Sequence, residues 1–131
     1  MDLKLKDKVI IVTGGSKGVG NGICNVLAAE GAIPVIVGRT QKDVINAEKE
    51  LTDSGKKAFH AFAELTDPEQ CKAVIDKVIT QFNRIDGLVN NAGVNDGVSL
   101  EHGNYKDFIQ SINRNLTHYY MMAHYALPYL K

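Results

Sequence analysis

Short apolar runs alternate with amphipathic stretches along this chain of 131 residues. Val9–Thr13 and Val35–Val37 are compact runs rich in Val and Ile, which is typical of strands buried on both faces of a parallel sheet. Ala58–Phe62 and Gly87–Val89 carry weaker versions of the same signal. The pattern therefore predicts a strand at each of these segments, with helices between them, where apolar residues recur at helical spacing.

The first two predicted helices carry stop signals at their ends. The first runs from about Val19 to Glu30 and is expected to stop at Gly31, because glycine tolerates the left-handed backbone that follows a helix. The second runs from Thr40 through Leu51, with Gly55 beyond its end. Thr40 and Asp43 stand three positions apart, as a capping pair at a helix start would.

The third helix has the clearest start. It begins at Asp67, with Pro68 at the first helical position and Gln70 where a capping box has Glu or Gln. It ends near Asn83, a residue that tolerates the left-handed conformation.

The last helix, predicted over Asn104–Leu130, carries two stripes of residues. The first stripe consists of Phe108, Ile112, Leu116, Tyr119, Ala123, Ala126 and Leu130, and the second of Asn115, His118, Met122, Tyr125 and Tyr129. One of the two stripes must cover the sheet. The other either packs within the same fold or meets a partner subunit.

This alternation of strands and helices predicts an α/β fold with a parallel sheet and helices on both faces. Right-handed crossovers make the doubly wound, Rossmann-type sheet the simplest topology. Pro34 lacks a ladder donor, so we expect it at the entrance to the second strand and not inside it. The length suits one domain, residues 1–131.

The segment Thr13–Gly20, T-G-G-S-K-G-V-G, joins the first strand to the first helix. Gly14 can supply unusual backbone angles, and the missing side chains at Gly18 and Gly20 allow a ligand to approach closely. The unpaired N–H groups and positive end of the following helix suit a diphosphate. The spacing is neither G-x-G-x-x-G nor that of a P-loop, in which a lysine follows the last glycine.

A second motif, Asn90–Gly93, follows the fourth predicted strand as N-N-A-G. The carboxyl ends of strands in a doubly wound sheet border the ligand crevice. Asparagine amides there either hold neighbouring strand ends together or contact a ribose, and the residues alone leave both alternatives open.

Together, T-G-x-x-x-G-x-G and N-N-A-G make the chain resemble the amino-terminal half of a short-chain dehydrogenase/reductase, from about Leu5 to its last residue. The resemblance implies a cofactor diphosphate at the glycine turn and a nicotinamide ribose at the second motif. It also implies that Asn115 is the family's catalytic asparagine, which holds a water in the proton relay; without the resemblance, Asn115 reads as a solvated helix residue. The implied cofactor-binding residues are Gly14, Ser16, Gly18, Val19 and Gly20 at the diphosphate and Asn90, Asn91, Ala92 and Gly93 at the ribose.

The end of the second strand favours NADP over NAD. An NAD site carries an acidic residue about twenty positions past the glycine turn, and here Gly38 takes that place, followed by Arg39. A guanidinium binds a 2′-phosphate bidentately, and Lys17 supplies a second positive charge. Glu64 and Leu65 stand where the family has an aspartate that contacts the adenine amino group, so the geometry of adenine recognition differs here.

No tyrosine in the chain is followed four positions later by a lysine, so the family's proton-donating pair is missing. We therefore expect a fragment, truncated after the fourth strand and its long helix, that is inactive by itself and exposes an unpaired strand edge. The leading function is an NAD(P)-dependent oxidoreductase that transfers hydride between the cofactor and an alcohol or carbonyl. A noncatalytic dinucleotide-binding or regulatory module is the alternative.

The composition of the chain excludes some classes of binding partner. The 15 basic and 15 acidic residues cancel and form no block, so we expect no nucleic-acid or membrane partner. Cys24 and Cys71 read as reduced core thiols of a cytoplasmic protein, and the four histidines show no metal-ligand spacing. The last two are His118 and His124, on different faces of the long helix, where we expect surface or packing roles.

The loop after N-N-A-G, together with the segment around Asn115, resembles sugar dehydrogenases of the L-fucose dehydrogenase type. In that case Asn95 and Asp96 would hydrogen-bond a polyol. The family resemblance also implies a homo-oligomer, a dimer or tetramer, joined through the long helix.

Overall fold

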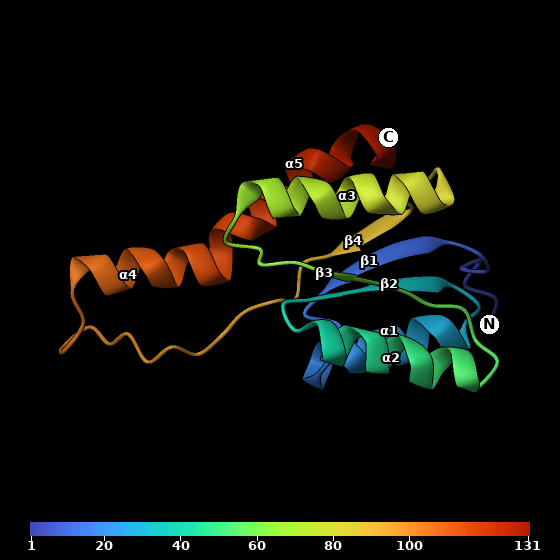
Figure 1. Ribbon diagram of the computed structural model, residues 1–131, viewed down its shortest axis with the longest axis horizontal. Helices are drawn as coiled ribbons and strands as arrows, with labels where there is room; N and C mark the ends of the chain where they lie inside the picture. Colours follow the sequence, from blue (N-terminus) through green and yellow to red (C-terminus); the bar gives the residue numbers. More distant parts are fainter.

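The computed structural model describes residues 1–131 as a parallel sheet between two layers of helices (Figure 1). The strands are β1 (Val9–Thr13), β2 (Ile33–Gly38), β3 (Phe59–Phe62) and β4 (Gly87–Val89). They lie in the order β3-β2-β1-β4, and each neighbouring pair is parallel. The predicted doubly wound α/β fold is confirmed.

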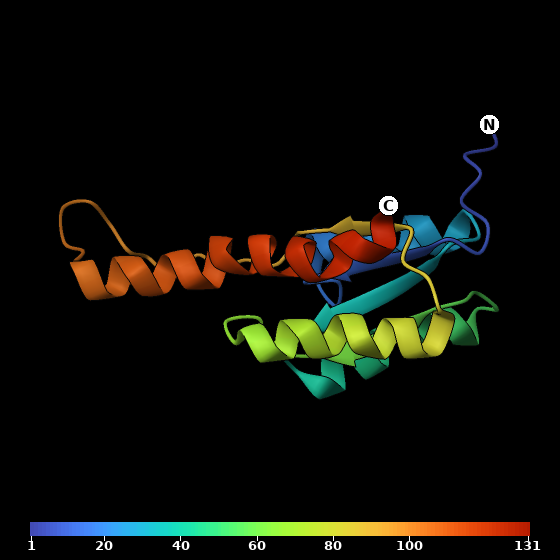
Figure 2. The same cartoon turned by 90° about the horizontal axis from the view of Figure 1, so that it is seen from above.

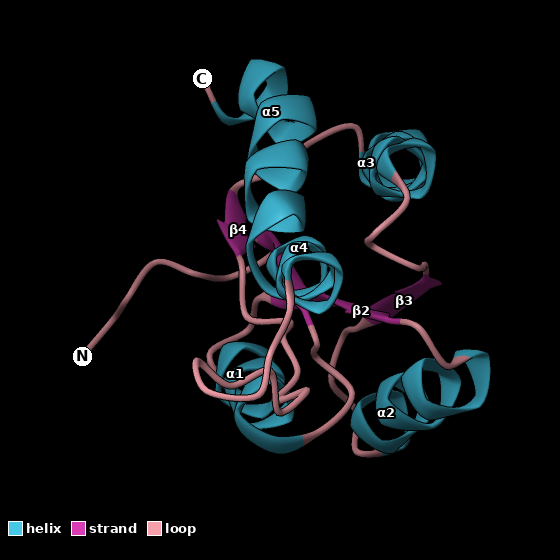
Figure 3. Ribbon diagram, turned by 90° about the vertical axis from the view of Figure 1, so that its left-hand side faces the viewer, coloured by secondary structure: helices cyan, strands magenta, loops and turns pink.

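Two helices cover each face of the sheet (Figures 1 and 3). Helices α1 (Gly18–Ala29) and α2 (Gln41–Asp53) lie on one face, and α3 (Pro68–Phe82) and α5 (His118–Leu130) lie on the other. Successive residues of β1 divide between the layers: Ile11 belongs to the core under α3 and α5, and Val12 to the core under α1 and α2. This two-sided burial explains why the strands read as continuous apolar runs.

The predicted helix over residues 104–130 is not a regular α-helix. Helix α4 (Tyr105–Ile112) passes into a π-helical segment, η1 (Asn113–Thr117), before α5 begins. Figure 2 shows the three as one rod, of which α4 extends beyond the sheet. None of the residues of α4 is buried, whereas His118, Met122 and Ala126 of α5 are. Most of the second predicted stripe therefore faces the sheet, with Tyr129 exposed. Of the first stripe, Ala126 joins the core, and the other residues are exposed or half-buried.

The helix ends follow the predictions in part. Asp67 caps α3 by accepting a hydrogen bond from the Glu69 N–H at 3.0 Å, and Asn83 ends the helix in the left-handed region with φ 57°. The capping box is wrong, because Gln70 Oε1 accepts from the Glu64 N–H at 2.7 Å and not from Asp67. Thr40 precedes α2 but makes no side-chain capping bond.

Pro34 lies inside β2, and our prediction of it at the entrance is wrong. It is the second residue of the strand and is buried opposite Ile10 of β1. The Ile33 N–H donates to Lys8 O at 2.8 Å on the β1 side, so the N–H that Pro34 lacks would face β3. Pairing with β3 begins only at Val35, and the missing donor therefore breaks no ladder bond.

Both cysteines are free and buried, as expected for core thiols. Burial raises the pKa of Cys24 to about 12 and that of Cys71 to about 11, so neither forms a thiolate at neutral pH. None of the helices combines the length and the apolar character needed to cross a lipid bilayer.

Asp86 fixes the start of β4 to the start of β1. Its carboxylate accepts the Val9 N–H at 2.8 Å, and its own N–H donates to Val9 O at 2.8 Å. Arg84 holds the same carboxylate through two nitrogens, at 2.8 and 2.7 Å. Burial alone would raise the pKa of Asp86, but Arg84 and the Val9 N–H outweigh it, so the pKa lies below the ordinary 3.8.

We predict that Asp86→Asn lowers the free energy of unfolding by about 1–3 kcal/mol at neutral pH, because a charge-assisted clamp is lost. A carboxyl with a lowered folded-state pKa stabilises above its unfolded pKa, so the difference should persist above about pH 4 and fade as the pH drops further. Urea unfolding across pH 2–7 measures it. Asp76→Asn, in the exposed pair with Lys72, is the control and should change stability by about 0.5 kcal/mol or less. Equal losses in both variants would contradict the clamp.

Candidate functional site

A cleft of about 440 Å³ lies where the carboxyl ends of the strands meet the loops that follow them. It is bordered by the glycine turn after β1, the end of β2, the loop after β3 and the residues after β4. Ten of the predicted site residues line it: Gly14, Ser16, Lys17, Val19, Arg39, Glu64, Leu65, Asn91, Ala92 and Gly93. Four other predicted site residues do not line it: Gly18, Gly20, Asn90 and Asn115.

The glycine turn brings α1 close to the sheet. Gly14 and Gly18 have positive φ angles of 66° and 56°, which glycine adopts without strain. A Cβ at Gly20 would lie 2.1 Å from Gly14 O and 2.5 Å from Asn91 Nδ2, so only glycine fits there. The first-turn N–H groups of any helix lack intrahelical acceptors, and the side chain of the N-cap residue Lys17 does not supply one for α1.

A buried threonine ties this turn to the N-N-A-G motif. Thr13 Oγ1 accepts the N–H groups of Asn91 at 2.9 Å and Ala92 at 3.0 Å. In return, Asn91 Nδ2 donates to Thr13 O at 3.1 Å and to Gly14 O at 3.3 Å. Of the two alternatives for these asparagines, the Asn91 amide holds strand ends together. Asn90 instead ties the end of β4 to helix α5, by donating to Tyr119 O at 3.1 Å. Thr13 is the threonine of the glycine motif, but it was not among the predicted cofactor-binding residues.

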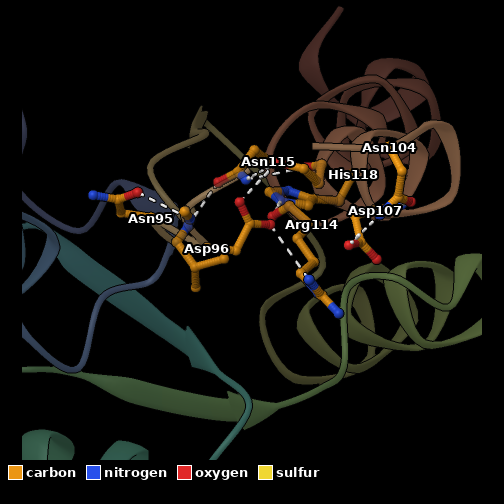
Figure 4. A network of polar contacts seen from close by, with 10 residues as sticks. Asn95, Asp96, Asn104, Asp107, Arg114, Asn115 and His118 are labelled. Carbon is orange, nitrogen blue, oxygen red and sulfur yellow. Dashed lines mark hydrogen bonds and ion pairs between the residues drawn. The ribbon is translucent and has the colours of Figure 1, made fainter. Parts of the chain in front are cut away.

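Asn115 lies in the π-helical segment and positions the loop after β4 (Figure 4). Its Oδ1 accepts the Val94 N–H at 2.7 Å, and its Nδ2 donates to Ser111 O at 3.0 Å. The interpretation as a solvated helix residue is therefore wrong. Both ends of the amide thus bond to other parts of the chain, and the catalytic role of Asn115 stays a prediction.

The same loop is held at a second point, Asp96 (Figure 4). Its carboxylate accepts Ser111 Oγ–H at 2.9 Å and pairs with Arg114 Nη1 at 3.3 Å. The Ser111 hydrogen bond is the main reason that the pKa of Asp96 lies below its ordinary value, with Arg114 contributing. These bonds occupy the carboxylate, so Asp96 is poorly placed to bind a polyol, whereas Asn95 is exposed.

The cleft is also lined by two residues of the long helix that the motifs did not predict, Arg114 and His118. His118 is only 2% exposed. Its Nε2 lies 2.7 Å from Arg114 O, and because a carbonyl only accepts, Nε2 carries the proton. Of the two roles expected of this histidine, surface or packing, the structure shows packing. Its place beside the cleft depends on how the helix docks on the sheet.

Charged residues gather where the glycine turn meets the end of β2. Lys17 Nζ forms an ion pair with Asp43 Oδ2 at 3.0 Å. Arg39 is exposed, and none of the ion pairs of the structure involves it. A Cβ at Gly38 would lie 2.9 Å from Val44 Cγ1, so an acidic side chain has little room there.

A family model described as short chain dehydrogenase matches residues 8–131. The chain belongs to the short-chain dehydrogenase family. This confirms the resemblance inferred from the two motifs, and the match covers every element from β1 to α5.

Relatives of this family match almost the whole chain. It is 33% identical to the glucose and ribitol dehydrogenase homolog 2 of Arabidopsis thaliana, covering 98% of this chain and 47% of the relative. It is also 33% identical to a 3-oxoacyl-acyl-carrier-protein reductase of Thermotoga maritima, covering 98% of this chain and 52% of the relative. The chain thus spans about half the length of the curated relatives it matches.

Solved structures agree with this fold. The Cj0485 dehydrogenase is 40% identical, with a TM-score of 0.88 over 99% of this chain and 49% of that one. The L-sorbose reductase of Gluconobacter frateurii, complexed with NADPH and L-sorbose, is 27% identical, with a TM-score of 0.93 over 99% of this chain and 50% of that one. This short-chain dehydrogenase chain therefore has the family's fold throughout its described residues.

Gly20 and Gly22 allow a matched test of the turn. We predict that Gly20→Ala lowers the free energy of unfolding by about 2 kcal/mol or more, because the added Cβ collides with backbone that cannot yield. Gly22→Ala places its Cβ in open space on the same helix, and should stabilise the protein by about 0.5–1 kcal/mol. Chemical denaturation of both variants measures the difference. Equal effects at the two positions would show that the turn has room.

Proposed function

We propose that the cleft binds a nicotinamide dinucleotide, with the diphosphate at the glycine turn. The observation that carries this proposal is that the uncapped start of α1 borders the cleft at the carboxyl ends of the strands, through Lys17 and Val19. Similar solved structures are complexed with NADPH, with NAD and with NADP. In this arrangement Gly14, Ser16, Gly18, Val19 and Gly20 form the diphosphate cradle, while Asn91, Ala92 and Gly93 border the ribose on the nicotinamide side.

Within that proposal, the cleft prefers NADP to NAD. Arg39 is exposed at the cleft with no carboxylate partner, which leaves its guanidinium available to a 2′-phosphate. The crowding around Gly38 keeps out the acidic side chain that binds a 2′-hydroxyl in NAD sites. Glu64 and Leu65 form the neighbouring wall, where adenine would lie.

We predict that 2′,5′-ADP binds more tightly than 5′-AMP, as measured by titration calorimetry. Arg39→Met should weaken 2′,5′-ADP binding by about tenfold or more, because one charge-assisted contact is lost, and should leave 5′-AMP binding nearly unchanged. Lys56→Met removes an exposed charge beyond the end of α2 and is the control. Equal affinities for the two nucleotides in the unmodified protein would refute the NADP preference.

The reaction we propose is hydride transfer between the cofactor and an alcohol or carbonyl. The bound nicotinamide supplies or accepts the hydride. Asn115 is proposed to hold a water of the proton relay, supported by its position in a π-helical segment, since such segments are frequent at functional sites.

For the substrate we propose a sugar or polyol. Two similar proteins are named for such compounds, a glucose and ribitol dehydrogenase homolog and an L-sorbose reductase. A competing class comes from an 11-beta-hydroxysteroid dehydrogenase of Sesamum indicum, 29% identical. Activity of the whole protein on steroids and none on aldoses or ketoses would decide against the sugar.

We propose that the 131-residue chain is inactive by itself. We predict that the 131-residue chain binds NADPH without oxidising it in the presence of carbonyl substrates, followed by absorbance at 340 nm, because it has no Tyr-x-x-x-Lys pair. Steady turnover would contradict this. A coding frame that continues beyond Lys131 into such a pair supports the enzyme, and a stop there favours the noncatalytic dinucleotide-binding module.

We further propose a homo-oligomer in the cytoplasm. The exposed stripe along α4 and η1 includes Phe108, 46% exposed, and Leu116, 60% exposed. Apolar surface of this kind suits contact with a second subunit, which light scattering would detect. The two free thiols suit a reducing compartment.

A further inference from the structure

We propose that Asp43 competes with the cofactor's 2′-phosphate for Lys17, and so limits the discrimination between NADP and NAD. This inference rests on the proposed function and concerns the same cleft. Asp43 belongs to neither the glycine motif nor the N-N-A-G motif. The structure brings it to the cleft from the first turn of α2.

The geometry places three segments side by side at this end of the cleft. A Cβ at Gly38 would lie 3.3 Å from Ser16 Oγ and 2.9 Å from Val44 Cγ1, so the glycine turn, the end of β2 and the start of α2 are in contact. The ion pair between Lys17 Nζ and Asp43 Oδ2, at 3.0 Å, bridges the first and third of these segments. Both residues line the cleft, and Arg39 lies between them in the chain.

The two cations at this end of the cleft, Arg39 and Lys17, differ in whether a carboxylate neutralises them. Arg39 has no ion-pair partner, whereas the charge of Lys17 is already balanced by Asp43. A phosphate monoester carries a charge of about −1.5 to −2 at neutral pH. When such a group approaches Lys17, the ammonium must leave Asp43 or the carboxylate must stay beside a second anion. Either route weakens the binding of a ligand with a 2′-phosphate and leaves the binding of a ligand without it unaffected.

A purely structural role for the pair predicts something different. Lys17 is 77% exposed and Asp43 29% exposed in their side chains, and an ion pair this open adds little to stability. Asp43 also lies near the positive end of α2, where a carboxylate is mildly stabilising. Loss of either effect would change the unfolding temperature without changing the preference between two nucleotides.

The test compares Asp43→Asn with Asp53→Asn, an exposed carboxylate at the far end of α2. Titration calorimetry with 2′,5′-ADP and with 5′-AMP gives the affinities, and thermal unfolding checks that each variant folds. We expect Asp43→Asn to tighten 2′,5′-ADP binding by about three- to tenfold and to change 5′-AMP binding by less than about twofold. Asp53→Asn should change neither affinity.

A double-mutant cycle separates competition for Lys17 from simple repulsion. In a Lys17→Met background the gain from Asp43→Asn should largely disappear, because nothing remains to be released. An undiminished gain there overturns the competition, and so does an unchanged or weaker 2′,5′-ADP affinity in Asp43→Asn alone. Failure of the proposed function looks different, because the unmodified protein would then bind neither nucleotide, or both equally, and Arg39→Met would have no effect.

Discussion

The Thr13 hydroxyl holds together the ends of β1 and β4, and the cleft is built around that junction. Thr13 is fully buried, and its hydroxyl oxygen accepts the backbone N–H groups of Asn91 and Ala92, the second and third residues of the N-N-A-G motif. The Asn91 amide completes the junction by donating to the backbone of the glycine turn. Without these bonds, the half-buried N–H groups of Asn91 and Ala92 would lose their acceptor inside the fold, which destabilises the folded state. The glycine turn and the second motif are thus a single polar unit.

The junction of the glycine turn with the N-N-A-G motif also explains why position 20 must be glycine. Gly20 must lack a side chain because α1 passes within contact distance of Gly14 O and the Asn91 amide. Close packing at the back of the turn is thereby joined to an open helix end at the front, where an anion can approach. In this protein the spacing of the glycine motif reflects packing as much as ligand binding.

The two ends of the long helix have different environments. The part formed by α5 covers the sheet, whereas α4 extends beyond it with no buried residue (Figure 1). Between them, the π-helical segment turns Asn115 towards Val94 and places Arg114 at the cleft. A change of helical register at this point redirects side chains that a regular helix would carry on another face.

The sequence by itself determined the order of strands and helices, the doubly wound sheet and the family. Those follow from local signals: buried strands are apolar throughout, helices carry their own end residues, and two motifs keep fixed spacing. Ten of the predicted site residues line the cleft for the same reason, since they directly follow strands whose carboxyl ends meet there.

Only the tertiary structure decided what depends on contacts between distant segments. It showed that Pro34 fits inside β2, because the neighbouring strand starts one residue later. It showed that the side chains of Asn91 and Asn115 bond to the backbone, and that Asp43 forms an ion pair with Lys17 at the edge of the cleft. Such pairings arise between residues far apart in the chain or on separate elements, and no local pattern of hydrophobic and polar positions encodes them.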